Sequence, residues 1–299
     1  TGPGLHPEVL AALQRQEHAL GIAPSTARTA HLQALEPRAG QPGTAVVITG
    51  QQVGLFLGPL FTFFKAASVI AVARAMEQES GVRCVPLFWL QTEDHDYAEI
   101  DHCYTYRPGS EPLKSQLVPD DEAVSVLQQR TSIAHRCLPR SIVDQLDALQ
   151  EALGELPMAA DFLQLLRAHY RPGASLSGAF ASVLSEVFSD EGLLVFDPRQ
   201  ALISALARPL YQRVLTEHDT VAELLLARTA QLHSAGLAEQ VHVRKAASLL
   251  FFHDGEVAGP RYRLERTSTG FEVPGQRFGQ DQLLALLQQE MNMSTPLVG

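Results

Sequence analysis

The chain has 299 residues, 45% of them hydrophobic and 19% charged, and its formal net charge is −10. This length and composition are typical of one large globular domain, or of a core domain that carries a substantial insertion. The acidic balance argues against nucleic acid or an anionic membrane as the main partner, because a negatively charged surface repels both.

The sequence gives no sign of a membrane span, a secretion signal or a disulfide framework. The longest apolar run, residues 53–73, is broken by Gly, Pro and Lys, and predicts a loop followed by a buried helix. Residues 1–12 lack a basic start and an apolar segment, and the three cysteines are widely spaced without a CxxC pair. We therefore expect a cytoplasmic protein.

The hydrophobic pattern predicts an α/β chain. The predicted elements are, in chain order, helices over 7–21 and 24–35, a strand over 45–49, a helix over 60–76, a strand over 83–90, a helical turn over 97–100, a strand over 103–106, short hairpins within 107–140, helices across 139–170 with a break at 154–157, a helix over 176–188, a strand over 193–196, helices across 200–236, antiparallel strands over 247–253 and 261–265, and a last helix over 281–291. We divide the chain into a helical lead-in (1–43), the first part of a core (44–106), an insertion (107–175), a second core segment (176–236), and a small insertion with a return toward the core (237–299).

Two of these strands and the helix between them have the spacing of a βαβ unit. Residues 45–49 and 83–90 are apolar, as in strands buried on both faces of a parallel sheet. Ser80-Gly81 suits the C-terminus of the intervening helix. We expect the two strands to be parallel neighbours, with 193–196 as a third parallel strand. Ligands of open α/β sheets bind at the carboxyl ends of the strands, so the residues that follow each strand are the best site candidates.

A loop rich in glycine and glutamine, residues 50–54, follows the first strand. Its glycines and Gly58 would let the backbone approach a ligand closely, and its two glutamines suit hydroxyl, amide or sugar contacts. Pro59 suits the first turn of the next helix, whose N-terminal amides would attract an anion. Thr62 and Lys65 lie on one face of that helix, and the lysine could hold a phosphate or carboxylate. The alternative is a turn followed by a surface lysine.

Residues 93–96 read Glu-Asp-His-Asp in the loop that follows the second strand, and Glu99 lies three residues further on. Buried acids and imidazoles are costly unless they are paired. They suit a general acid/base set, metal ligands, or acceptors for an amine or polyol. The alternative is a solvated acidic loop in which Asp94 or Asp96 caps the following turn. If the two strands are neighbours, we expect this loop and the glycine/lysine loop to face one cleft.

Other signals are weaker. Arg171 precedes a helix N-terminus and could contact an anion, although Ser175 as a plain N-cap explains the pattern better. Asp197 either faces the cleft or forms a turn. His242 and His253 have no ligand spacing, and we expect structural or surface roles for them. The Walker A, GxGxxG, GxSxG and HExxH motifs are absent.

Two blocks of the sequence carry a family resemblance. ITGQQVGLFLGPLFTFFKA, followed by VPLFWLQTEDHDYAEIDH, resembles the BshC family of bacillithiol biosynthesis in order and spacing, and RPGASLSGAFASVLSEVFSDEGLLVFDPR fits the middle region of that family. The resemblance implies a Rossmann-like parallel sheet core with mostly helical connecting-peptide insertions. It also implies further strands and a C-terminal coiled coil for homodimerisation, which we expect beyond Gly299.

The resemblance implies a cysteine ligase that adds L-cysteine to glucosaminyl malate through an amide bond, with ATP as the expected source of activation. The catalytic candidates that it implies are Lys65, Glu93, Asp94, His95 and Asp96. The implied substrate- or nucleotide-binding candidates are Thr49, Gly50, Gln51, Gln52, Gly58, Pro59, Thr62 and Glu99. No resident metal is assigned. The alternatives are a metal-dependent hydrolase or nucleotidyltransferase that uses residues 93–96 as ligands, and an inactive binding fragment.

Overall fold

The computed structural model describes residues 5–37, 43–106, 109, 111–120, 130–239, 241–255, 258–289 and 292–295. The chain forms two compact units, Thr1–Gln200 and Ala201–Gly299. The first unit contains the parallel sheet and both sequence blocks that carry the family resemblance.

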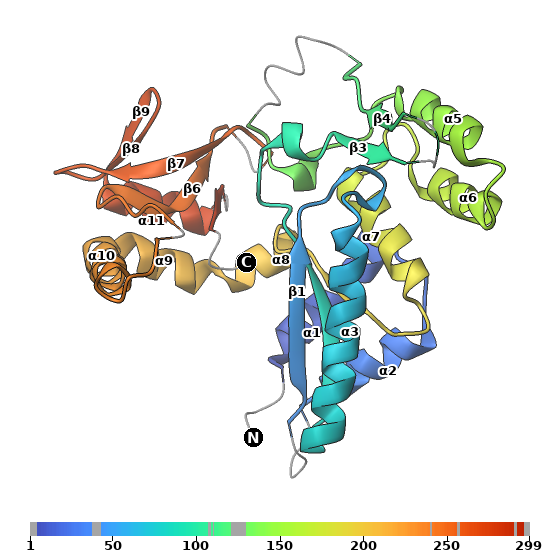
Figure 1. Ribbon diagram of the computed structural model, residues 1–299. Coiled ribbons are helices and arrows are strands. Elements are labelled where there is room, and N and C mark those ends of the chain that lie inside the picture. The colour runs from blue at the N-terminus through green and yellow to red at the C-terminus, as the bar shows by residue number, and fades with distance from the viewer. Residues whose placement is uncertain are drawn as a thin grey trace. The chain divides into compact units, whose positions relative to one another are not determined.

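A three-stranded sheet in the order β1-β2-β5 lies at the centre of the first unit (Figure 1). It consists of β1 (Ala45–Gln51), β2 (Cys84–Leu90) and β5 (Leu194–Phe196), and both pairings are parallel. The register places Gly50 opposite Trp89, and Trp89 opposite Phe196. The predicted βαβ unit and the third parallel strand are therefore confirmed. Most of β2 and all of β5 are buried, which explains why both segments are continuous apolar runs.

Helix α3 (Phe61–Ser80) connects β1 to β2 and runs beside both strands (Figure 1). It ends at Gly81, which adopts the left-handed conformation with φ 67°. The helix ends four residues later than the sequence predicts, because its last turn is tied to the next strand: the amide of Cys84 donates to Glu77 Oε2 at 2.8 Å. Before α3, the short helix η1 (Leu55–Leu57) is completely buried. Its Phe56 and Leu57 have positive φ values of 51° and 62°, so this loop holds a strained backbone next to the carboxyl end of β1.

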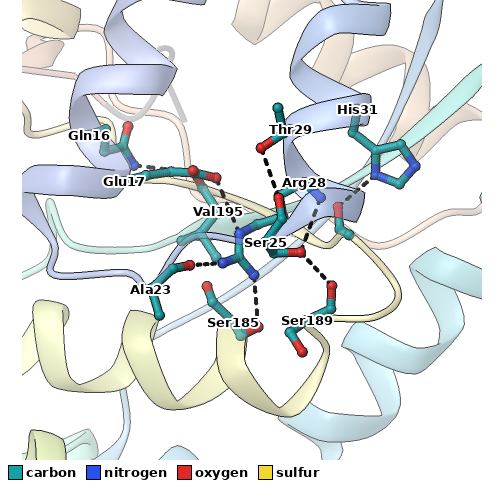
Figure 2. Close-up of polar contacts among 11 residues, drawn as sticks. Gln16, Glu17, Ala23, Ser25, Arg28, Thr29, His31, Ser185, Ser189 and Val195 are labelled. Atoms are coloured by element: carbon teal, nitrogen blue, oxygen red, sulfur yellow. Dashed lines mark hydrogen bonds and ion pairs between the residues drawn. The ribbon is translucent and has the colours of Figure 1, made fainter.

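Helices α1 (Pro7–Ala19) and α2 (Thr26–Ala34) agree with the predicted N-terminal helices. A buried arginine, Arg28, connects them to the rest of the first unit (Figure 2). Arg28 donates to the carbonyl oxygens of Ala23 and Ser185, and its guanidinium lies 3.4 Å from Glu17 Oε1. Gln16 adds a bond to the carbonyl of Val195 in β5. These contacts fix the helical lead-in against the strand whose end carries Asp197.

The insertion contains a small hairpin and a helical part. Strand β3 (His102–Thr105) pairs antiparallel with β4 (Leu113–Gln116) in a separate two-stranded sheet. Helices α5 (Ile142–Leu153) and α6 (Ala159–His169) follow, with the predicted break between them, and α7 (Leu176–Val187) then leads to β5. The remaining elements are the short helices η2 (Tyr97–Glu99) and η3 (Ile133–His135). Residues 121–129, part of the segment for which the sequence predicts hairpins, lie outside the described residues.

The second unit combines helices with an antiparallel sheet. Its helices are α8 (Ala201–Leu206), α9 (Arg208–Thr216), α10 (His218–Ser234) and α11 (Gln280–Gln289). Its five strands, in the order β10-β6-β7-β8-β9, are β6 (Ala247–His253), β7 (Arg261–Arg266), β8 (Phe271–Val273), β9 (Gln276–Phe278) and β10 (Met293–Ser294). The predicted antiparallel pair β6–β7 is confirmed. The strands β8 and β9, which have three residues each and are joined by a turn in which Gly275 has φ 81°, were not predicted from the sequence.

Within the described residues, none of the helices combines the length and the apolar character needed to cross a bilayer. Residues 53–73, the longest apolar run, form η1, the turn after it and the first part of α3.

Candidate substrate site

The carboxyl ends of the three parallel strands lie at one edge of the sheet. Gln51 and Leu90, the last residues of β1 and β2, are register partners, and the amide of Gln91 donates to the carbonyl of Gln51 at 3.0 Å. Asp197 directly follows β5. The three loops that begin here therefore start from the edge at which open α/β sheets bind their ligands.

Lys65 reaches back from α3 to the end of β1. Its Nζ donates to the carbonyl of Gly50 at 3.2 Å and to Gln51 Oε1 at 2.8 Å, and lies 5.2 Å from the ring centroid of Phe61. The side chain is half-buried, so Lys65 is not the solvent-directed surface lysine of the alternative interpretation. An ammonium group has three hydrogens. The two bonds leave one of them for a ligand at the carboxyl edge.

The glycines of this loop are required by the packing of the protein itself. A Cβ on Gly50 would lie 2.9 Å from the carbonyl oxygen of Trp89, and a Cβ on Gly58 would lie 2.9 Å from the Cβ of Cys103. A Cβ on Gly54 would lie 1.9 Å from the carbonyl oxygen of Gly58. These close approaches explain the glycines without a ligand, so glycine at these positions is not by itself a sign of ligand contact.

The N-terminus of α3 is a weaker anion site than the sequence suggests. Leu60 provides no side-chain cap, yet the amides of Thr62 and Phe63 already bond to the carbonyls of Pro59 and Leu60 at 2.9 and 3.0 Å. Pro59 is exposed in the turn before α3, while Thr49 is half-buried in β1. Thr62 is completely buried, and its hydroxyl has no hydrogen-bond partner among the described residues.

Gln52 joins the glycine/lysine loop to the acidic loop. Its Nε2 donates to Asp94 Oδ2 at 3.2 Å and also to Glu99 Oε2. The other oxygen of Asp94, Oδ1, accepts the amides of His95 at 2.7 Å and Asp96 at 3.4 Å. Asp94 therefore closes a turn within its own loop and at the same time holds the end of β1 through Gln52. It does not cap the helical turn at Tyr97–Glu99 as the alternative interpretation expects, because the N-cap of that turn is Asp96 and has no side-chain hydrogen bond.

The remaining members of the acidic loop differ in exposure. Glu93 is buried, with 1% of its surface exposed, whereas Asp96 is exposed and His95 is half-buried with Nδ1 3.5 Å from Asp94 Oδ1. Across the part of the chain that the structure describes, no group of three or more His, Cys, Asp or Glu side chains is arranged to hold a metal ion. The geometry thus gives no support to residues 93–96 as a ligand set.

The acidic loop contributes to a pocket of about 1040 Å³. The ionisable residues and the thiol that line it are Asp94, His95, Asp96, Tyr97, Asp101, Asp120, Arg130, His135, Arg136, Cys137 and Arg140. Its lining therefore combines carboxylates, mainly from the loop after β2, with guanidinium groups from residues 130–140. Residues 49–65 do not contribute to it. The prediction that the two loops face one cleft is therefore wrong for this pocket. The loops meet through Gln52, but only the acidic loop lines the pocket.

Arg136 and Tyr97 form a stacked pair in the lining. The guanidinium carbon lies 4.4 Å from the ring centroid, within the range of a cation–π contact. Burial raises the pKa of Tyr97 to about 12 and lowers the pKa of Arg136. The pair therefore presents a cation and a neutral phenol to the pocket at neutral pH.

A buried polar network, most of which the sequence did not predict, connects the end of β5 to the pocket lining. Thr92 Oγ1 donates to Asp197 Oδ1, which also accepts the amide of Arg199 at 2.9 Å. Arg199 Nη2 lies 3.3 Å from His135 Nε2, and Ser132 Oγ donates to the carbonyl of Thr92 at 2.5 Å. Burial raises the pKa of Asp197, and its hydrogen-bond donors oppose this change. The position of Asp197 after a buried strand was the only signal of this network that the sequence offered.

The weaker candidates have structural roles. Ser175 is the N-cap of α7 and accepts the amide of Gly178 at 3.2 Å. His253 is buried and bonds to Ser294 Oγ at 2.9 Å, and His242 lies 3.2 Å from Glu239 on the surface. These contacts agree with the structural and surface roles expected for them.

Comparison with known proteins agrees with this architecture. The family model described as "Bacillithiol biosynthesis BshC, N-terminal Rossmann-like domain" matches residues 5–298. Proteins from Koribacter versatilis, Geobacillus thermodenitrificans and Solibacter usitatus, each named "Putative cysteine ligase BshC", are 32%, 31% and 30% identical over 96%, 71% and 83% of this chain. The chain spans 50%, 38% and 44% of the length of these curated relatives. The name of these relatives is that of a ligase, not of a hydrolase or a nucleotidyltransferase. By the match over nearly its whole length, the chain belongs to the BshC family and represents its N-terminal Rossmann-like domain.

Proposed function

We propose that this chain carries the substrate-binding part of a cysteine ligase of bacillithiol biosynthesis, which joins L-cysteine to glucosaminyl malate through an amide bond. The observation that carries the proposal is the mixed charge of the pocket beside the carboxyl edge of the sheet. Carboxylates attract an ammonium group, and arginines bind carboxylates. A substrate that contains both an amino sugar and a malyl group needs both kinds of side chain.

The residues around the strand ends would act in distinct steps. Amide formation from a free carboxylate is uphill in water, so we propose ATP as a co-substrate that would activate the carboxyl group of cysteine by adenylation, with release of pyrophosphate. Lys65, with one ammonium hydrogen not used by the described residues, would bind a phosphate or carboxylate oxygen.

Asp94 or Asp96 would first hold the amino group of the sugar and then accept its proton. The freed nitrogen lone pair would attack the activated carbonyl carbon to form the new C–N bond, the C–O bond to AMP would break, and the nitrogen would lose its second proton to solvent. Gln52 would keep Asp94 in position for this transfer through its bond to Oδ2.

The proposed partners are small molecules: cysteine, glucosaminyl malate and ATP. For chains of the full length of the relatives we propose homodimers with a coiled coil, and we propose a cytoplasmic location. Sedimentation of such a chain tests the dimer, and a purely monomeric species would contradict it.

The test of the function is an assay of cysteine-dependent consumption of glucosaminyl malate by a chain of the relatives' full length, with and without ATP. The expected result is amide product only when cysteine and ATP are both present. The variants Lys65→Ala and Asp94→Asn should lose activity, while Arg167→Ala, which removes a surface contact with Asp147, should not. Full activity in both site variants would show that the assignment of the site is wrong.

A further inference from the structure

His135 is held in place on the pocket lining by the loop that follows β2. Its own segment is anchored through three bonds: the amide of Ile133 to the carbonyl of Asp94 (2.8 Å), the amide of Ala134 to the carbonyl of Thr92 (3.1 Å), and the hydroxyl of Ser132 to the same carbonyl (2.5 Å). The half-buried imidazole lines the pocket. Its position is therefore fixed relative to the acidic loop.

Arg199 determines which nitrogen of His135 carries the hydrogen. Arg199 is 5% exposed, and its Nη2 lies 3.3 Å from His135 Nε2. A guanidinium group only donates hydrogen bonds and stays charged, so Nε2 must be the acceptor. The hydrogen of the neutral ring must then lie on Nδ1. Burial, together with the charge of Arg199, lowers the pKa of His135 to about 4, so the ring stays neutral at physiological pH.

The Nδ1–H group has no hydrogen-bond partner among the described residues, since the contact with Arg199 uses the other nitrogen. The ring shares the lining with Arg130, Arg136 and Arg140. A fixed N–H donor beside guanidinium groups is suited to a carboxylate oxygen.

We propose that His135 is a specificity-determining residue that binds a carboxylate of the substrate through its Nδ1–H, with Arg199 as the positioning residue that fixes this tautomer. This inference rests on the proposed function, in which the carboxylate belongs to the malyl group. It goes further in naming the residues that recognise that group.

Calorimetric titration with L-malate tests the inference without any ligase reaction. An Asn side chain can place an N–H near the position of Nδ1, whereas Gln reaches the position of Nε2 and leaves the Nδ1 position empty. His135→Asn should bind malate within about threefold of wild type, and His135→Gln should bind it about 10- to 150-fold more weakly, the range for one hydrogen bond to a charged group. His169→Gln, which changes a histidine of α6 in contact with Glu186, is the matched control and should bind as wild type does.

Three results would overturn the inference: no malate binding by wild type, equal binding by wild type and His135→Gln, or equal losses in the Asn and Gln variants. Heteronuclear NMR of the histidine ring nitrogens in wild type gives a second test that needs no variant. The expected spectrum has the hydrogen of His135 on Nδ1, and a hydrogen on Nε2 or a doubly protonated ring at neutral pH contradicts the account. His135-dependent binding of malate by a chain of the relatives' full length that shows no ligase activity would refute the proposed function alone.

Discussion

Arg28 offers the sharpest test of how the N-terminal helices stabilise the first unit. Only 1% of this residue is exposed. Its guanidinium donates to the carbonyls of Ser185 and Ala23 and pairs with Glu17 at 3.4 Å (Figure 2). The substitution Arg28→Met keeps most of the length of the side chain and removes all three contacts. It leaves two carbonyl groups and a largely buried carboxylate without their cation.

Two estimates of the cost agree. Hydrogen bonds from a charged group contribute about 1.5–3 kcal/mol each, so two of them amount to roughly 3–6 kcal/mol. Removing one partner of a buried ion pair costs about 3–5 kcal/mol. We therefore expect Arg28→Met to lower the free energy of unfolding of the first unit by about 3–5 kcal/mol. Arg167→Met is the matched control, because its contact with Asp147 is on the surface and should contribute about 0–1 kcal/mol.

The assay is urea unfolding followed by tryptophan fluorescence. Trp89 is the only tryptophan and lies in β2, so its emission reports the first unit. The double variant Arg28→Met with Glu17→Gln should recover part of the loss, because the remaining buried charge is then removed as well. A loss in Arg28→Met no larger than that in Arg167→Met would refute the reasoning that this buried cation fixes the lead-in helices.

Three further predictions concern the strand ends. Lys65→Met should lower kcat/KM for cysteine addition at least about 100-fold, while the free energy of unfolding should change by only about 1 kcal/mol. A normal rate would show that Lys65 has no role in the reaction. Gln52→Glu should destabilise the first unit by about 1–3 kcal/mol in urea, because a third carboxylate then faces Asp94 and Glu99; a neutral effect would show that the bridge is unimportant. The bond from the Cys84 amide holds the pKa of Glu77 below its usual value, so its contribution to stability is present above the unfolded-state pKa and is lost as pH falls through the lower folded-state pKa. In Glu77→Gln, the free energy of unfolding measured with urea should therefore fall less steeply as the pH is lowered. An unchanged pH dependence would show that Glu77 does not cause it.

The parallel sheet could be predicted because its strands carry strong local signals. Val85, Leu87 and Phe88 lie in a strand buried on both faces, so the apolar run is continuous, and Gly81 marks the end of α3. The short strands β8 and β9 were missed because three residues are too few to show a period of two. The glycines at 50 and 58 suggested ligand contact, but a single sequence does not show that Trp89 and Cys103 approach them so closely.

The polar residues of the site could be predicted from the sequence only where they lie in a loop just after a strand. Asp197 directly follows β5 and Glu93–Asp96 begin three residues after the end of β2, so both lie at the carboxyl edge. His135 lies in a turn-rich segment, and its partner Arg199 is 64 residues away. Contacts of this kind depend on the tertiary fold and leave no periodic pattern, so neither His135 nor Arg199 could be linked to the pocket from the sequence.

A crystal structure with bound glucosaminyl malate would show whether the substrate lies in this pocket and in which orientation. We expect the amino group of the sugar within about 3 Å of Asp94 or Asp96, and a malyl carboxylate at a similar distance from His135 Nδ1 and the neighbouring arginines. A substrate bound away from this pocket, or with its amino group among the arginines, would rule out the proposed site.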